Sequence, residues 1–125
     1  PLPSSLKRKA AGSIIGNWTS ATVSTEWSYL DWPVSSADLE KLRGVRFVFT
    51  SGSHALEIDG VELLENGKII ARDQHAGLAG KPSRGNFYKL SLPKGIHANN
   101  GCSLRARVRS VGGKSSNGKL ELIKE

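Results

Sequence analysis

The sequence predicts an all-β fold, an antiparallel β-sandwich of the jelly-roll type with about eight strands and at most one short helix. From residue 44 onward, short runs rich in β-forming residues are separated by Gly, Asn, Ser and Pro. Within several of these runs apolar and polar residues alternate, which is the period of a strand with one buried face. The 125 residues, 38% hydrophobic and 23% charged, suit a single folded domain with one core.

Residues 1–12 differ from the rest, because they are dominated by Pro, Ser, Lys and Ala and contain the basic run Lys7 to Lys9. This composition is typical of a linker or an N-terminal arm, so the β-sandwich module is expected to comprise residues 13–125. The predicted strands, in chain order, are Ile14–Trp18, Trp27–Val34, Val45–Thr50, Ala55–Leu64, Lys68–Asp73, Phe87–Leu92, Ser103–Ser110 and Lys119–Ile123.

Two local signals mark connections between these strands. The pair Asn66-Gly67 tolerates positive φ at both positions, which predicts a tight hairpin turn between the fourth and fifth strands. The segment 35–42 begins with N-cap residues and continues with helix formers, so it predicts one or two helical turns. Cys102 is the single cysteine and is expected to pack in the core.

The segment 69–75 is the first candidate for a functional site. Alternation places Ile69, Ala71, Asp73 and His75 on one face of a strand that leads into a loop with glycines at 77 and 80. Asp73 and His75 have the groups to hydrogen-bond a sugar hydroxyl, ligate a metal or act as an acid and base. The alternative is that they hold the 77–80 loop through backbone hydrogen bonds.

Arg84 and Tyr88 follow closely and complete a region in which Asp, His, Arg and Tyr fall within one short span. A sugar needs a planar group to stack on and a few directed donors and acceptors. A glycan site is therefore expected where Asp73 and His75 emerge from the sandwich, with Arg84 and Tyr88 as neighbours.

Tryptophan supplies a second candidate. Trp27 and Trp32 lie an odd number of residues apart, so in a regular strand they face opposite sides and one of them is expected to be exposed. An exposed ring would serve as a stacking platform for a glycan, whereas a buried ring is part of the core.

The basic residues give a third candidate surface. Arg105, Arg107 and Arg109 alternate with apolar residues and should line one sheet face, where they could bind an anionic glycan. The alternative is a solvated face balanced by carboxylates of neighbouring strands, namely Glu57, Asp59 or Glu121. The formal charge of +7 does not indicate nucleic acid, because no aromatic residues interleave these arginines and no recognition helix is predicted.

Several classes of protein are disfavoured. No apolar run is long enough to span a membrane. The sequence contains no Gly-rich phosphate loop, no Cys/His metal spacing and no Gly-x-Ser-x-Gly elbow, so neither a cofactor nor a metal is expected. Carboxylates two residues apart, such as Glu57 and Asp59, are typical of the solvent-exposed face of a strand, so they do not indicate the active site of a glycosidase. A non-catalytic domain is therefore expected.

The chain resembles a β-sandwich domain at the C-terminus of bacterial exo-acting glycoside hydrolases, most of all the tail domains of β-N-acetylhexosaminidases. The resemblance is carried by the segments 52–58, 61–67 and 73–80, and also by Tyr88, 104–110, 112–113 and 116–118. It implies a galactose-binding-like sandwich in a secreted, extracellular or periplasmic enzyme.

Two functions follow as expectations. The first is a carbohydrate-binding module that recruits its parent enzyme to a glycan, either neutral or anionic. The second is a structural accessory domain that packs against the parent catalytic domain and has no ligand of its own.

Overall fold

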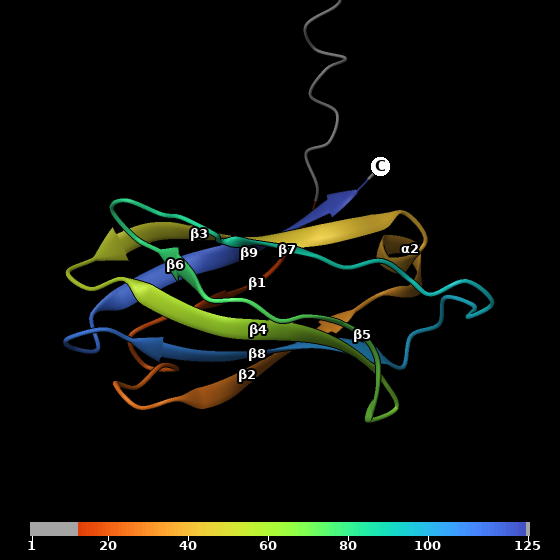
Figure 1. Cartoon of the computed structure of the whole chain (residues 1–125), viewed down its shortest axis with the longest axis horizontal. Helices are drawn as coiled ribbons and strands as arrows, with labels where there is room; N and C mark the ends of the chain where they lie inside the picture. The colour runs from red at the N-terminus through yellow and green to blue at the C-terminus, as the bar shows by residue number, and fades with distance from the viewer. Residues whose placement is uncertain (1–12, 125) are drawn as a thin grey trace, which may run out of the picture.

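The structure, a computed structural model, describes residues 13–124, which form two antiparallel β-sheets packed face to face (Figure 1). Sheet A has the strand order β1-β9-β3-β7, and sheet B has the order β2-β8-β4-β5, with β6 also paired to β4. The strands are β1 Ile14–Trp18, β2 Ser28–Val34, β3 Leu42–Gly52, β4 Leu56–Glu65, β5 Lys68–Asp73, β6 Gly77–Ala79, β7 Phe87–Lys89, β8 Cys102–Ser110 and β9 Ser116–Lys124. The predicted all-β sandwich is thus confirmed, while the arm predicted for residues 1–12 lies outside the described residues.

The short helix α2 (Ser36–Leu39) connects β2 of sheet B to β3 of sheet A. Its N-cap is Ser35, whose hydroxyl accepts a hydrogen bond from the backbone N–H of Asp38 at 3.2 Å. This is the cap that the sequence predicts at the start of segment 35–42. Leu39 is fully buried, so the helix closes one end of the core.

The inner faces of the two sheets follow the predicted alternation. In β8, the side chains of Leu104, Ala106 and Val108 are fully buried, and the arginines between them lie on the outer face of sheet B. Cys102 at the start of β8 is also buried, as predicted, and burial raises the pKa of its thiol, with a smaller contribution from Glu65.

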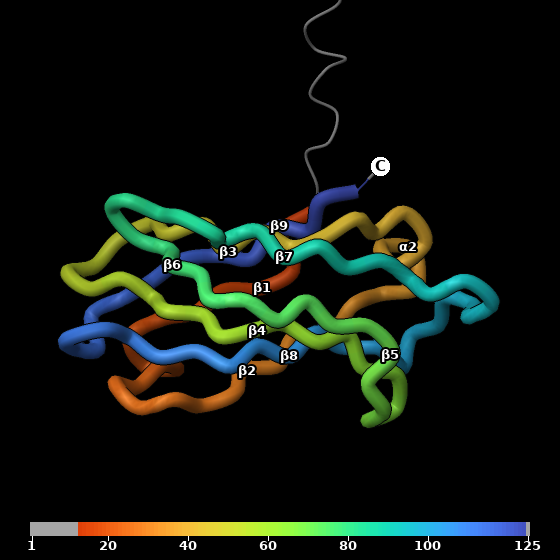
Figure 2. Tube along the Cα trace, viewed as in Figure 1, coloured from red at the N-terminus to blue at the C-terminus, as the bar shows by residue number. Residues whose placement is uncertain are grey.

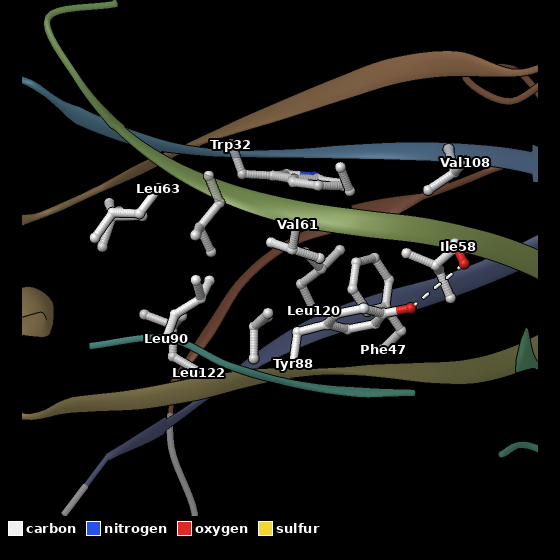
Figure 3. Packing of buried hydrophobic residues seen from close by; sticks show 14 of the residues in the cluster. Trp32, Phe47, Ile58, Val61, Leu63, Tyr88, Leu90, Val108, Leu120 and Leu122 are labelled. Carbon is white, nitrogen blue, oxygen red and sulfur yellow. Dashed lines mark hydrogen bonds between the residues drawn. The ribbon is translucent and has the colours of Figure 1, made fainter. Parts of the chain in front are cut away.

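Aromatic rings fill the centre of the sandwich around Phe47 of β3 (Figure 3). The Phe47 ring lies 6.0 Å from Trp18, 6.2 Å from Trp32 and 5.8 Å from Tyr88, measured between ring centroids. The last two pairs are edge-to-face, a geometry that adds to the energy of burial. These four rings come from both sheets and hold them together.

The turn between β4 and β5 is the hairpin that Asn66-Gly67 predicts, and it projects from the sandwich in Figure 2. Asn66 and Gly67 have φ values of 51° and 86°, the positive values that a two-residue hairpin requires.

The structure corrects three local expectations. Residues 77–79, expected to be loop, form β6, which pairs with β4 at Leu56–Ile58. The strand predicted to end at residue 92 ends at residue 89. In β5, a bulge opposite residues 63–64 leaves Ile69 39% exposed and brings Ile70 against the core, so Ile69 does not share the buried face of Ala71.

Candidate functional site

Asp73 and His75 form a clasp at the edge of sheet B. Nδ1 of His75 lies 2.9 Å from Oδ1 of Asp73, and Nε2 lies 3.0 Å from the carbonyl oxygen of Gly85. The second oxygen of Asp73 accepts a hydrogen bond from the backbone N–H of Lys89 at 2.7 Å. The clasp therefore ties the end of β5 to segment 85–89, which follows β6 in the chain.

Both nitrogens of the His75 ring face hydrogen-bond acceptors. A neutral imidazole donates through only one nitrogen, so the geometry is fully satisfied by the doubly protonated ring. Burial disfavours the charge, but the hydrogen bonds to Asp73 and Gly85 outweigh it and raise the pKa of His75. The ring is also stacked on Tyr88, with centroids 4.0 Å apart and an interplanar angle of 10°, which suits a cation on an aromatic face.

Tyr88 anchors the clasp from inside. Its side chain is fully buried, and the single proton of its hydroxyl is shared between the carbonyl oxygens of His75 at 3.0 Å and Ile58 at 3.4 Å. The contact with Ile58 is drawn in Figure 3. Burial, with smaller contributions from Asp73 and Asp59, raises the pKa of Tyr88, so the hydroxyl remains a donor. Tyr88 therefore supports the site from the core and offers no exposed ring to a ligand.

A pocket of about 220 Å³ opens beside the clasp. Its walls are the side chains or backbone of Glu57, Ala76, Gly77, Leu78, Arg84 and Gly85. Its floor is fixed by two backbone hydrogen bonds between Leu78 and Arg84, at 2.8 and 2.9 Å. The predicted neighbour Arg84 is thus at the pocket, and its side chain is exposed.

Glycine is required at position 77 for the pocket to take this shape. A Cβ added there would lie 2.3 Å from the carbonyl oxygen of Gly85 and 2.5 Å from the hydroxyl of Tyr88. The first contact is with backbone, which cannot move aside cheaply. Gly77 therefore allows β6 and segment 84–85 to approach each other closely.

The outer face of sheet B carries a ladder of ion pairs. Each arginine of β8 is bonded to a carboxylate of β4 across the sheet, and these partners are opposite or nearly opposite in the strand register. The pairs are Arg109 with Glu57 at 2.7 Å, Arg107 with Asp59 at 2.8 Å and Arg105 with Glu62 at 3.3 Å. The predicted solvated face is therefore balanced by carboxylates of a neighbouring strand.

Glu57 and Asp59 balance this face as predicted, but Glu121 does not. Glu121 is in β9 of the other sheet, where its carboxylate lies 3.5 Å from Arg46. The sequence places Glu121 on the outside of its strand but cannot say which sheet that strand joins.

Two aromatic rings cover the ladder. The guanidinium carbons of Arg107 and Arg109 lie 4.6 and 4.7 Å from the centre of the Trp27 ring, and that of Arg105 lies 5.4 Å from Tyr29. Trp27 is partly exposed, and Tyr29 is 59% exposed. These distances suit cation–π contacts, which hold the rings on the sheet surface.

Trp32 occupies the opposite side of the sheet, as its position relative to Trp27 predicts. It is 7% exposed, and its indole N–H donates to the carbonyl oxygen of Asn17 at 3.0 Å. Trp32 is therefore a core residue and offers no surface to a glycan, because its ring packs against Phe47 and its polar atom is already bonded.

The structure thus separates the predicted site residues into four places. Asp73 and His75 form the clasp with Tyr88 buried beneath it, Arg84 lines the pocket, Trp27 lies on the outer face of sheet B, and Trp32 lies in the core. Sequence reasoning missed the roles of Glu57 in the pocket and of Tyr29 beside Trp27. The signal for Tyr29 is its spacing of two residues from Trp27 within a predicted strand.

No protein-family model matches the chain, and neither does any curated protein. Within residues 13–124, no helix has the length and apolar character that crossing a membrane requires. In the same part of the chain, no group of three or more His, Cys, Asp and Glu side chains is placed to hold a metal ion.

Proposed function

We propose that this domain is a non-catalytic carbohydrate-binding module of a secreted carbohydrate-active enzyme, which it recruits to glycan. The observation that carries the proposal is the pocket beside the clasp, which is lined by the charged residues Arg84 and Glu57 together with Ala76 and Leu78. Sugar hydroxyls both donate and accept hydrogen bonds, and sugar C–H groups need apolar contact. The pocket offers a donor, an acceptor and an apolar wall within one small volume.

The size of the pocket supports a single sugar unit. Pockets for drug-sized ligands have volumes of roughly 300–1,000 Å³. At about 220 Å³ this pocket is smaller, so it suits one ring of a glycan and leaves the rest of the chain outside.

The carboxylates support binding without catalysis. Glycosidases use two carboxyl groups on opposite sides of the bond that they cleave. Among the described residues that line the pocket, Glu57 carries the one carboxylate, and its Oε1 accepts from Nε of Arg109. The hydrogen bond from Arg109 fixes the orientation of the Glu57 side chain, which fits recognition of a hydroxyl group.

The test is a glycan array probed with this chain. Each glycan that binds is then titrated against the unsubstituted chain and against the Arg84→Ala variant. Losing a charged hydrogen bond costs about 1–3 kcal/mol, so affinity should fall roughly 5- to 150-fold. Lys81→Ala is the matched control, because Lys81 is an exposed cation on the same turn that does not line the pocket. Absence of any hit, or equal effects of the two substitutions, would contradict the proposal.

A second candidate function is structural packing against the parent catalytic domain. The observation that favours it is an open hollow of about 380 Å³ lined partly by apolar residues of β1 and β2, with Ile14 52% exposed at its edge. If this function is the correct one, Ile14→Asp should weaken association with the catalytic domain of the parent enzyme and leave every array signal unchanged.

A further inference from the structure

The pocket is one end of a row of side chains that crosses the outer face of sheet B. Glu57 of β4 is paired with Arg109 of β8 on one side and with Leu78 of β6 on the other. Leu78 is bridged in turn to Arg84, and Trp27 lies over Arg109 at the opposite end. Directly paired residues of antiparallel strands point to the same face, which places Glu57, Arg109, Leu78 and Arg84 together. Trp27, which precedes β2, joins this row through its contact with Arg109.

The row has the length of a short oligosaccharide. Neighbouring strands lie about 4.7–4.9 Å apart, so the three steps from β2 through β8 and β4 to β6 cover about 14 Å. A pocket for a single sugar ring lies at the β6 end, and the Trp27 ring lies at the β2 end. A chain that enters the pocket can therefore continue across Glu57 and Arg109 to reach Trp27.

The charges of this surface favour a neutral ligand. Ion pairs join Arg105 and Arg72 to Glu62, Arg107 to Asp59 and Arg109 to Glu57. With Arg84 and the exposed Asp31, which the strand pairing places on the same side, five arginines stand beside four carboxylates, so the charges of this face nearly balance. A sulfated or uronic acid chain would have to compete with these fixed carboxylates, which would repel it. The net charge of +7 for the whole chain therefore does not describe the charge of this face.

The paired arginines keep the capacity to bind hydroxyl groups. A guanidinium has five N–H donors, and the ion pair of Arg109 with Glu57 uses the one on Nε. The Arg109 side chain is 40% exposed although Trp27 lies over its guanidinium, so part of it can contact a ligand. The ion pair fixes the orientation of the guanidinium, which lowers the entropy lost when a sugar binds.

We propose that a neutral glycan chain lies across sheet B, at right angles to its strands, with one sugar ring in the pocket and another stacked on Trp27. This inference rests on the proposed function and adds the class of glycan and the path of the chain. It explains why Trp27 is supported by two guanidinium groups, since a ring held flat needs no ordering when a sugar stacks on it.

The experiment compares chain length with substitution in calorimetric titrations. The probes are glucose, mannose and N-acetylglucosamine and their neutral β-1,4-linked disaccharides to tetrasaccharides, with a sulfated oligosaccharide and a uronic acid oligomer as charged probes. We expect affinity to rise from monosaccharide to tetrasaccharide for the sugar that binds, and to be higher for neutral than for charged probes.

Trp27→Ala should lower affinity for the tetrasaccharide about tenfold and leave affinity for the monosaccharide unchanged. Trp27→Tyr retains a flat ring and should keep most of the tetrasaccharide affinity, while melting curves show whether either variant is destabilised. The matched control is Phe87→Ala on the outer face of sheet A, where a 36% exposed ring is also covered by an arginine, Arg46.

The outcomes separate the two proposals. If a monosaccharide binds and Arg84→Ala abolishes its binding, but chain length and Trp27→Ala have no effect, the path across sheet B is wrong and the proposed function remains. Preference for either charged probe also overturns the inference. If no probe and no glycan on the array binds, the proposed function itself is wrong.

Discussion

The outer faces of the two sheets differ, although both sheets contribute to one core. Sheet B carries three ion pairs between β8 and β4, two aromatic rings over the arginines and the pocket. Sheet A carries the Arg46–Glu121 pair, with a longer separation of 3.5 Å, and the Phe87 ring beside Arg46.

The comparison shows which features the fold itself requires. Both inner faces are filled by buried side chains, which the sandwich needs for its stability. Surface ion pairs contribute little to stability, about 0–1 kcal/mol each. The ladder therefore adds little to the stability of the fold, and it distinguishes the outer face of sheet B from that of sheet A.

The largest expected effect concerns the aromatic cluster of the core, to which both sheets contribute. Phe47→Ala should destabilise the domain by about 3–5 kcal/mol, because Phe47 is fully buried and contacts three other aromatic rings. Urea unfolding followed by tryptophan fluorescence would measure the loss. A loss below about 1 kcal/mol would show that the sheets do not depend on this ring cluster.

The second effect tests whether the clasp of Asp73 and His75 positions the neighbouring pocket. His75→Ala removes two hydrogen bonds and the stacked ring over Tyr88, so the free energy of unfolding should fall by about 1–3 kcal/mol. Affinity for any glycan that binds in the pocket should fall as well, because Gly85, which lines the pocket, loses its hydrogen bond to the His75 ring. Unchanged stability and affinity in the same variant would show that the clasp does not position the pocket.

The pH dependence of stability tests whether His75 is charged in the folded protein. The folded pKa of His75 is raised above its ordinary value of 6.5, so its contribution is fully present below about pH 6.5 and is lost as the pH rises through the folded pKa. Urea midpoints measured from pH 5.5 to about 8.5 should therefore fall by less in His75→Gln than in the unsubstituted chain. Parallel curves for the two proteins would contradict a charged His75.

The smallest effect compares one arginine from each face. Arg109→Ala and Arg46→Ala should each cost up to about 1 kcal/mol of stability, since both pairs are substantially exposed. Only Arg109→Ala should lower glycan affinity, because Arg109 orients Glu57 and supports Trp27. Thermal melts and titrations of the two variants in parallel would measure both quantities, and equal glycan affinities would remove the functional distinction between the faces.

The sequence by itself determined the features that depend on neighbouring residues. Alternation in 104–109 separates buried from outward side chains, Asn66-Gly67 allows the positive φ of a hairpin, and Ser35 caps the short helix. Each of these signals acts within a few residues of the chain, where strand periodicity, backbone sterics and local hydrogen bonding are decided.

Only the tertiary structure decided which distant residues meet. The bonding of His75 to Gly85, the burial of Tyr88, the place of Glu57 in the pocket and the pairing of Glu121 with Arg46 all depend on strand order and register. These are set by how the two apolar faces pack as a whole, and a shift of one residue or one strand position would bring different partners together. The local pattern tells which side chains face outward, and the packing of the sheets tells what they face.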